Sequence, residues 1–240
     1  MKKSKFTIDI EKKLKTLTKT SDLSPFDPKK YIVGQSHSDL TFLKLRTADI
    51  KKLVHKDYVF KNMKNIWNET NIYEAMHITL YWLDLQSIEF LYQHQKEILH
   101  FSKRIDNWAH SDSLCCLLAK IFEYDSAYLL KEFTKFNQHK NLWLRRISMV
   151  SLFYYSSQRK KQPPFKLAQK FIENNILDKE YYVQKAIGWT LREMYNVYPK
   201  QALLFISKNI LSISSVAWVA ASEKLPTPTK QKLLLIRRKK

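Results

Sequence analysis

Residues 181–194, YYVQKAIGWTLREM, show most directly which fold the chain adopts. Val183, Ile187, Leu191 and Met194 recur at intervals of three and four residues, the spacing of the buried face of an amphipathic α-helix. The segment therefore predicts a helix with a single core face.

Trp189 lies almost opposite this stripe, between Lys185 and Arg192 on the helical wheel. A large aromatic side chain flanked by two cations on the solvent face indicates that something packs there. Gly188, beside it, lets another backbone or a ligand approach closely. Two interpretations stay open: Trp189 contacts a ligand, or it fills a groove against the next helical element.

The helical character extends over the whole chain. No proline occurs between Pro28 and Pro163, and there are two glycines, Gly34 and Gly188, where average usage gives roughly seventeen. At 240 residues and 45% hydrophobic content, we expect one domain over 1–240, with an N-terminal helix and loop over 1–40 and a basic tail over 228–240. Helices are predicted at 6–20, 48–55 (capped by Thr47), 57–69, 71–85, 87–103, 107–123, 125–138, 141–157, 164–176, 179–196, 200–209, 212–222 and 227–237.

Taken in pairs, these helices form hairpins every 35 to 40 residues or so. Such a period indicates an all-α protein, an α-solenoid or superhelix of HEAT-like helical repeats, although a plain helical bundle leaves similar traces. We expect an extended curved surface with function on its concave side.

Composition excludes several classes of site. Two glycines 154 positions apart cannot supply a Gly-rich phosphate loop, a dinucleotide fingerprint or a nucleophile elbow. Cys115 and Cys116 are adjacent and cannot form an ordinary disulfide, and the seven histidines lack metal-ligand spacing, so neither a disulfide framework nor a metal site is expected. Without a membrane-spanning run or a secretory signal, we expect a cytoplasmic monomer that makes no membrane contact.

The charge is distributed unevenly. Residues 1–20 contribute +5, residues 21–155 contribute +3 and residues 156–240 contribute +12 to the net charge of +20. This asymmetry favours a polyanion, nucleic acid before membrane, as partner. A solvated surface with a disordered basic tail is the plainer alternative.

A second anomaly lies in residues 141–155. Leu142, Met149 and Phe153 share a face, and Arg146 stands among them. An arginine on an apolar stripe needs a partner, because an unpaired charge is costly to bury. That partner is either an internal carboxylate or a phosphate.

A third anomaly lies in the predicted helix 107–123. Trp108 and Asp112 are one turn apart, and Cys115, Cys116 and Ala119 continue that side as a shelf of small residues. A carboxylate beside an indole suits a cation, although an acid near a helix N-terminus is also favoured by the macrodipole. Asp112, Arg146 and Trp189 follow one another at 34 and 43 residues, so stacked repeats would bring the three side by side.

Several motifs resemble the AlkD-type DNA alkylation repair glycosylases, a family built of HEAT-like helical repeats. The similarity runs from about Leu43 to Ser222. The motifs are FLKLRTADIKKL (42–53), IWNETNIYEAMHITL (66–80), NWAHSD (107–112), NLWLRRISMV (141–150) and, most specifically, YVQKAIGWTLREM (182–194).

The resemblance implies base excision repair: hydrolytic release of cationic N3- or N7-alkylated purines from duplex DNA, with no cofactor and without flipping the base. It implies that Asp112 is the catalytic carboxylate, and that Trp108 and Trp189 line the cleft. Arg146 would hold a phosphate, and Arg145, Lys185 and Arg192 complete the expected DNA-binding set. The enzyme would associate with the nucleoid when bound to DNA.

The chain departs from the family pattern at Ala109, which stands where members often carry an acid. His110 beside it is a candidate local proton acceptor. The alternative function is a catalytically inactive HEAT-repeat protein that binds DNA or lesions through the same cleft. A third class, a protein-interaction scaffold, leaves the charge and the Trp/Asp/Arg set without a role.

Overall fold

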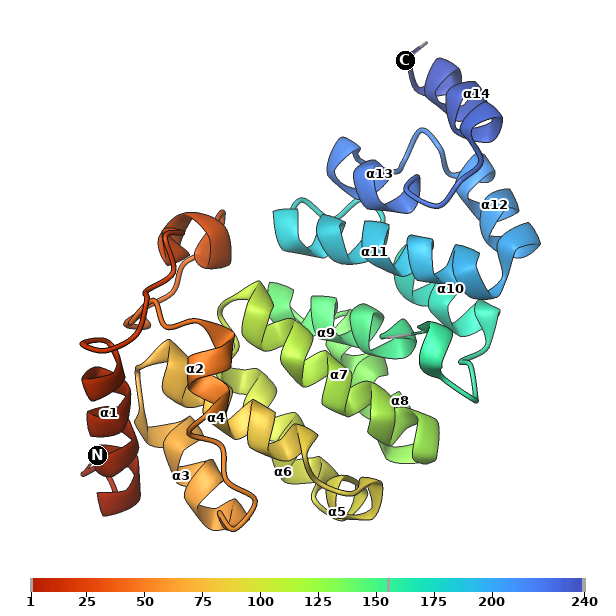
Figure 1. Cartoon of the computed structure of the whole chain (residues 1–240). Coiled ribbons are helices and arrows are strands. Elements are labelled where there is room, and N and C mark those ends of the chain that lie inside the picture. The colour runs from red at the N-terminus through yellow and green to blue at the C-terminus, as the bar shows by residue number, and fades with distance from the viewer. Residues whose placement is uncertain (1, 155, 239–240) are drawn as a thin grey trace. The chain divides into compact units, whose positions relative to one another are not determined.

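The computed structural model describes residues 2–154 and 156–238, and the regular elements among them are helices (Figure 1). Among these described residues, Thr41 and Ile72 form one isolated parallel β-bridge. The predicted all-α fold is therefore confirmed. The chain divides into two compact units, 1–117 and 118–240, which are described separately, and the single domain over 1–240 stays a prediction.

The first unit contains the shorter and more irregular elements. Its helix α7 continues across the boundary into the second unit. The elements are α1 (Lys5–Leu17), the π-helical turn η1 (Lys29–Val33), α2 (Thr47–Lys51), α3 (Phe60–Glu69), α4 (Tyr73–Asp84), α5 (Ile88–Gln93), α6 (Gln95–His100), the 3-10 turn η2 (Phe101–Arg104) and α7 (Trp108–Tyr124).

The second unit holds the two helices that carry the anomalies of the sequence, α9 and α11. Its elements are α8 (Ala127–Asn137), α9 (Leu142–Phe153), the 3-10 turn η3 (Ser156–Gln158), α10 (Phe165–Glu173), α11 (Tyr181–Val197), α12 (Pro199–Lys208), α13 (Ser215–Ala221) and α14 (Thr227–Arg238).

Polar side chains at the N-caps fix where several helices begin. Ser4, Ser87, Asn141 and Ser214 each accept a hydrogen bond from a backbone N–H of the first turn of the helix that follows. Such a cap satisfies a donor that has no partner within the helix. In α1 the cap is extended, because Glu69 of α3 accepts hydrogen bonds from the backbone and hydroxyl of Ser4, both at 2.8 Å.

Helices α9 and α11 form the centre of the second unit. Both are buried over most of their length, and α13 packs against α11. Gly188 makes this approach possible, because a Cβ atom at that position would overlap the carbonyl oxygen of Ala217 and lie 2.9 Å from its Cα. The sequence indicated that either another backbone or a ligand approaches Gly188. In the structure it is the backbone of α13 at Ala217.

Two of the predicted helices, those over 87–103 and 48–55, differ most from the structure. The helix expected over 87–103 is interrupted at His94, whose backbone (φ −101°, ψ 16°) ends α5 and begins α6, and it finishes in η2. The His94 ring lies 4.6 Å from Phe60 and 4.5 Å from Phe90, so tertiary packing favours the break. Thr47 is the first residue of α2 rather than its cap, and α2 ends at Lys51.

The basic tail is helical as far as Arg238, in agreement with the helix predicted at 227–237. Arg237 anchors it: the guanidinium donates to the carbonyl oxygens of Ile210 (2.9 Å) and Ile213 (2.6 Å) and lies 5.2 Å from the Trp218 ring. The tail is thus part of the second unit, and Lys239 and Lys240 lie outside the described residues.

No helix in the described part of the chain combines the length and the hydropathy that a membrane span requires.

We predict that Gly188→Ala destabilises the protein. Replacing glycine inside a helix ordinarily gains about 1 kcal/mol of helix propensity. Here the new methyl group would meet the backbone of Ala217, and overpacking of this kind costs typically 1–3 kcal/mol. The free energy of unfolding, measured in urea, should therefore fall. Lys185→Ala, at an exposed position on the same helix, is the control; greater stability of Gly188→Ala would contradict the close packing of α11 on α13.

Candidate functional site

The N-terminus of α7 is fixed by a buried cap. Asn107 Oδ1 accepts from the backbone N–H of His110 at 2.9 Å, and Asn107 Nδ2 donates to Nδ1 of His110 at 2.9 Å. The other ring nitrogen, Nε2, donates to the carbonyl oxygen of Tyr73 at 3.1 Å, which defines the tautomer. Both Asn107 and His110 are fully buried. The cap ties α7 to α4 and fixes the orientation of the residues that follow.

Trp108 is the first residue of α7, and its indole is 37% exposed. Its Nε1 donates to the carbonyl oxygen of Tyr31 at 2.8 Å, so the segment around η1 orients the ring. Tyr31 is a positioning residue that the sequence did not reveal, because the contact is made by its backbone over a separation of 77 residues.

Asp112 lies one turn further along α7 and is half-buried. Asp112 is the fifth residue of α7, just beyond its first turn, which contains no acid, so the helix macrodipole favours it less than it would an acid at the helix start. The expected shelf of small residues is largely wrong: Cys115 and Ala119 are core residues, and Cys116 is half-buried. Helix α7 buries more of its circumference than a single stripe, so the wheel did not separate the core from the exposed side.

Two buried histidines, His110 on α7 and His77 on α4, lie next to each other. The rings of His77 and His110 are 4.4 Å apart, and Tyr73 stacks on His110 with centroids 4.5 Å apart. Burial lowers the pKa of His77 to about 3. Burial, reinforced by His77, also places the pKa of His110 well below its usual range. Both rings are therefore neutral near pH 7, and His110, whose two nitrogens bond within the protein, serves the fold rather than proton transfer.

In the second unit, Arg146 is 6% exposed and donates through Nη1 to the carbonyl oxygen of Tyr182 at 3.1 Å. The sequence predicted either a carboxylate or a phosphate as its partner, and the structure adds a backbone carbonyl of α11. Because α9 is buried on nearly all sides, Arg146 stands within the packing between α9 and α11 rather than on a single apolar stripe.

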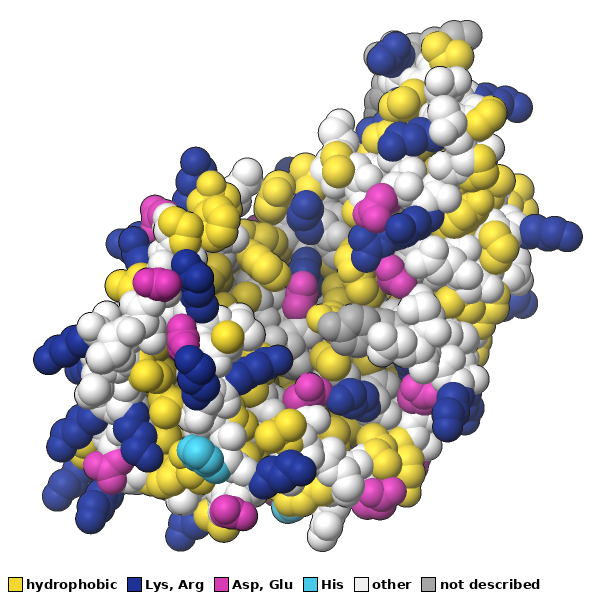
Figure 2. All heavy atoms as spheres, viewed as in Figure 1, with side chains coloured by type: hydrophobic (Ala, Val, Ile, Leu, Met, Phe, Trp, Pro, Cys, Tyr) yellow, Lys and Arg dark blue, Asp and Glu magenta, His cyan; other side chains and the backbone are white. Residues whose placement is uncertain are grey.

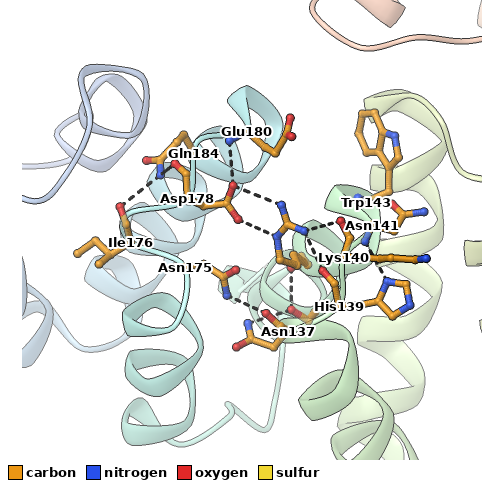
Figure 3. A network of polar contacts seen from close by, with 12 residues as sticks. Asn137, His139, Lys140, Asn141, Trp143, Asn175, Ile176, Asp178, Glu180 and Gln184 are labelled. Atoms are coloured by element: carbon orange, nitrogen blue, oxygen red, sulfur yellow. Dashed lines mark hydrogen bonds and ion pairs between the residues drawn. The ribbon is translucent and has the colours of Figure 1, made fainter.

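A polar network joins α9 to the segment before α11, and Figure 3 shows its members His139, Lys140 and Asp178. Arg145 bonds to all three. Its Nε donates to Asp178 at 2.7 Å and its Nη2 to the same carboxylate at 3.3 Å, while Nη1 reaches the carbonyl oxygens of His139 and Lys140. Asp178 also accepts from the backbone N–H of Glu180 at 2.8 Å. The charge of Arg145 is thus compensated inside the second unit.

Trp189 is half-buried, with its ring 5.6 Å from Tyr154 and 5.6 Å from the Arg192 guanidinium. Arg192 also donates to Glu193 at 3.0 Å and to Glu223 at 2.9 Å. Trp189 therefore packs partly against Tyr154, which directly follows α9 and so belongs to the preceding helical element rather than the next one, and it keeps one part of its indole accessible. Lys185, one turn earlier, is exposed.

The basic residues differ in how they are used. Of the six arginines that the structure describes after residue 117, five bond to carboxylates or backbone carbonyls: Arg145, Arg146, Arg159, Arg192 and Arg237. The lysines of α1 and of the second unit are mostly exposed, and Figure 2 shows Lys and Arg side chains over α1 and over α14. The predicted polyanion contact therefore depends chiefly on lysine.

Within each unit the structure places neighbouring candidates: Trp108 beside Asp112 on α7, and Arg146, Trp189 and Arg192 on the packed pair α9 and α11. The expected meeting of Asp112 with Arg146 and Trp189 joins the two units and stays a prediction. Among the described residues no group of three or more His, Cys, Asp or Glu side chains could hold a metal ion.

One further feature was not foreseen from the sequence. The first unit contains a cavity of about 550 Å³, lined from three segments, 24–32, 42–50 and 73–81. Its lining is rich in aromatic side chains that are far apart in the sequence, so no local pattern indicated it.

The chain is similar to known proteins at two levels. A family model described as DNA alkylation repair enzyme matches residues 28–225. A predicted DNA alkylation repair enzyme from Enterococcus faecalis has a similar structure, with a TM-score of 0.61 and 16% identity over 78% of this chain and 90% of that chain. No curated protein matches.

Two structures from Streptococcus mutans are also similar. AlkD2 has a TM-score of 0.57 and 17% identity, covering 91% of this chain and 100% of that chain. The protein smu.31 of strain UA159 has a TM-score of 0.56 and 17% identity over 92% and 100%. The predicted helical-repeat fold is confirmed by these likenesses.

We predict that stability falls as the pH drops from 7 to 5.5. A histidine whose pKa is depressed in the folded state stabilises the fold fully above its unfolded pKa of about 6.5, and this contribution is lost as the pH falls toward the folded value. His77 and His110 should together cost about 2 kcal/mol over this interval, measured by urea unfolding at each pH.

His110→Gln should reduce this pH dependence without abolishing it, because His77 remains, whereas His37→Gln, at an exposed histidine, should leave it unchanged. Equal stability of the wild-type protein at both pH values would contradict the burial of two neutral histidines.

Proposed function

Since the chain belongs to the family of DNA alkylation repair enzymes, as its motifs indicated, we propose that it is a DNA glycosylase. It hydrolyses the N-glycosidic bond of cationic N3- or N7-alkylated purines in duplex DNA. The observation that carries this proposal is the pairing on α7 of a half-buried carboxylate, Asp112, with a partly exposed indole, Trp108, one turn away. The protein works as a cytoplasmic monomer, bound to the nucleoid when engaged, and needs no cofactor.

The substrate supplies much of the driving force. An alkylated purine carries a positive charge, so when the bond between C1′ and the ring nitrogen breaks, the electron pair neutralises the base and the base leaves without an external acid. What develops is an oxocarbenium-like charge on the deoxyribose. The protein then needs a fixed negative charge near the sugar, and no pocket that encloses the base, so the lesion stays within the helix.

Asp112 supplies that charge. Its carboxylate stabilises the positive sugar and orients a water molecule, whose oxygen forms the new bond to C1′ while a proton passes to the carboxylate. The buried cap of Asn107 and His110 holds the start of the helix rigid, which keeps the carboxylate positioned before the reaction begins.

Trp108 and Trp189 recognise the cationic nucleotide. An indole face attracts a cation and packs on the deoxyribose. Trp108 is oriented for this by its hydrogen bond to Tyr31, and Trp189 by Tyr154 and Arg192. Both tryptophans contribute to catalysis in this proposal, because they hold the damaged nucleotide close to Asp112.

Arg146 and Lys185 attract the DNA backbone. Arg146 is a fixed cation held on Tyr182, and Lys185 is an exposed one beside Trp189 on α11. Phosphate contacts position a protein on DNA without reading its sequence, as repair at any site requires. Arg145 and Arg192 add to the positive field, although each also balances a carboxylate.

A second candidate is an inactive protein that binds DNA or lesions through the same residues. Ala109 favours it, because the resembling family often carries an acid there. The two candidates differ in whether free base appears.

We predict that the wild-type protein releases N7-methylguanine from duplex DNA and that Asp112→Asn reduces the rate by about 100-fold or more. The change preserves shape and removes the charge, so the melting temperature and DNA affinity should change little. Free base is measured by mass spectrometry under single turnover. Asp57→Asn, at an exposed aspartate of the same unit, should match the wild type. Binding without base release by the wild type would favour the inactive alternative.

We predict that Lys185→Gln weakens DNA binding without lowering stability, whereas Arg145→Gln lowers stability with little effect on DNA binding. Lys185→Gln should weaken DNA affinity and lower the slope of log K against log[salt] by about 1, because one phosphate contact is lost. Arg145→Gln should instead cost about 2 kcal/mol of stability, because the half-buried Asp178 carboxylate loses its cation and keeps only the backbone N–H of Glu180, with little change in slope. DNA affinity is measured by fluorescence anisotropy at several salt concentrations, and stability by urea unfolding. A lower salt slope for Arg145→Gln and lower stability for Lys185→Gln would assign the phosphate contact to Arg145 instead.

A further inference from the structure

The cavity of the first unit has the character of a ligand site. Its volume of about 550 Å³ lies within the range of small-molecule pockets, roughly 300–1,000 Å³. It is lined by the loop that contains η1, the segment that leads into α2, and one side of α4. All of these segments belong to the first unit.

Five aromatic rings line the cavity. Phe26 and Tyr31 lie on the exposed side, 59% and 52% exposed, with their rings 5.1 Å apart in an edge-to-face arrangement. Phe42 and Tyr73 contact each other at 4.9 Å on the inner side, and Tyr81 is the fifth. Hydrophobic side chains are visible over the segment around η1 in Figure 2. Two exposed aromatic rings beside a cavity indicate a flat apolar ligand.

A polar atom without a partner lies in the same lining. His77 is 4% exposed, and its Nδ1 has no hydrogen-bond partner among the described residues, whereas its Nε2 lies 3.5 Å from the Ser113 hydroxyl. Buried ring nitrogens are nearly always bonded, so an orphaned one that lines a cavity indicates a polar group on the occupant. A purely aliphatic ligand would leave it unsatisfied.

The charge at the opening is positive. Lys44 and Arg46 line the cavity and are exposed. The single acid in the lining, Glu74, is 1% exposed, and its carboxylate accepts from the backbone N–H of Leu43 at 2.9 and 3.0 Å. Lys44 adopts φ 61°, which curls the backbone around that carboxylate. Glu74 is thus used by the fold, and the cations remain available to an anionic group.

We propose that this cavity binds a single unstacked nucleotide. The base lies among the rings of Tyr31, Phe42 and Tyr81, its polar edge faces His77, and its phosphate contacts Lys44 and Arg46. Aromatic faces hold bases of any kind, because every base has a π-face, and cations at the rim hold the phosphate. Asp112 is not among the residues that line the cavity, and the proposal goes beyond glycosylase activity. The nucleotide comes either from solution or from an unpaired position in DNA.

The test uses the fluorescent base 2-aminopurine, whose emission falls when it stacks. Three probes are titrated with the full chain: 2-aminopurine deoxynucleoside, its 5′-monophosphate, and a duplex with 2-aminopurine opposite an abasic site. We expect quenching by the wild type. Tyr31→Leu should weaken binding about 10-fold, the loss of one stacking partner, and Tyr31→Phe should restore it. Tyr124→Leu, at an exposed tyrosine outside the cavity, is the matched control.

Arg46→Gln distinguishes the contribution of the phosphate to binding from that of the base. It should weaken the monophosphate about 10-fold and leave the nucleoside unchanged. Quenching by the monophosphate alone assigns a free nucleotide as occupant, and quenching by the duplex alone assigns an unpaired base of DNA. Absence of quenching with all three probes, or equal affinity of Tyr31→Leu, Arg46→Gln and wild type, would overturn the proposal. Base release from N7-methylguanine DNA is measured separately with the wild-type protein, so that failure of this proposal and failure of the glycosylase proposal can be told apart.

Discussion

The buried pairing of Asn107 with His110 is the interaction on which the candidate site depends. Through it the first turn of α7 is capped, and through the His110 bond to Tyr73 the same turn is fastened to α4. A neutral histidine is required, because Nδ1 must accept a hydrogen bond from the Asn107 amide while Nε2–H donates one to the Tyr73 carbonyl oxygen. Trp108 and Asp112 therefore stand on a rigid helix start. Preorganised charge is effective in catalysis because nothing has to reorganise when the transition state forms.

In the second unit, arginine and lysine side chains have different roles. Arginine presents five donors in a planar fork and suits carboxylates and clustered carbonyls, so most of the described arginines there hold helices together. Lysine is a flexible point charge and stays exposed. The net charge of +20 is thus not a direct measure of DNA contacts, since several charges that it counts are balanced within the fold.

The sequence predicted most helices because their signals are local: periodic apolar residues, few glycines and capping side chains. It missed the break at His94 and the bond of Arg146 to the Tyr182 carbonyl oxygen, because each depends on groups that are distant in the chain, and it also missed the π-helical turn η1. Gly188 was recognised as a point of close approach, but only packing showed that α13 is what approaches. The wheel misjudged Cys115 and Ala119, since a helix buried on most sides has no single core stripe.

In the proposed mechanism the positive charge of the damaged base drives its departure while the protein stabilises the sugar. Comparing release of N7-methylguanine, a cation, with release of O6-methylguanine, a neutral base of similar size, from otherwise identical duplexes tests this directly. We expect release of the cationic base only. Equal release of both bases would contradict the mechanism and would require a group on the protein that protonates the leaving base.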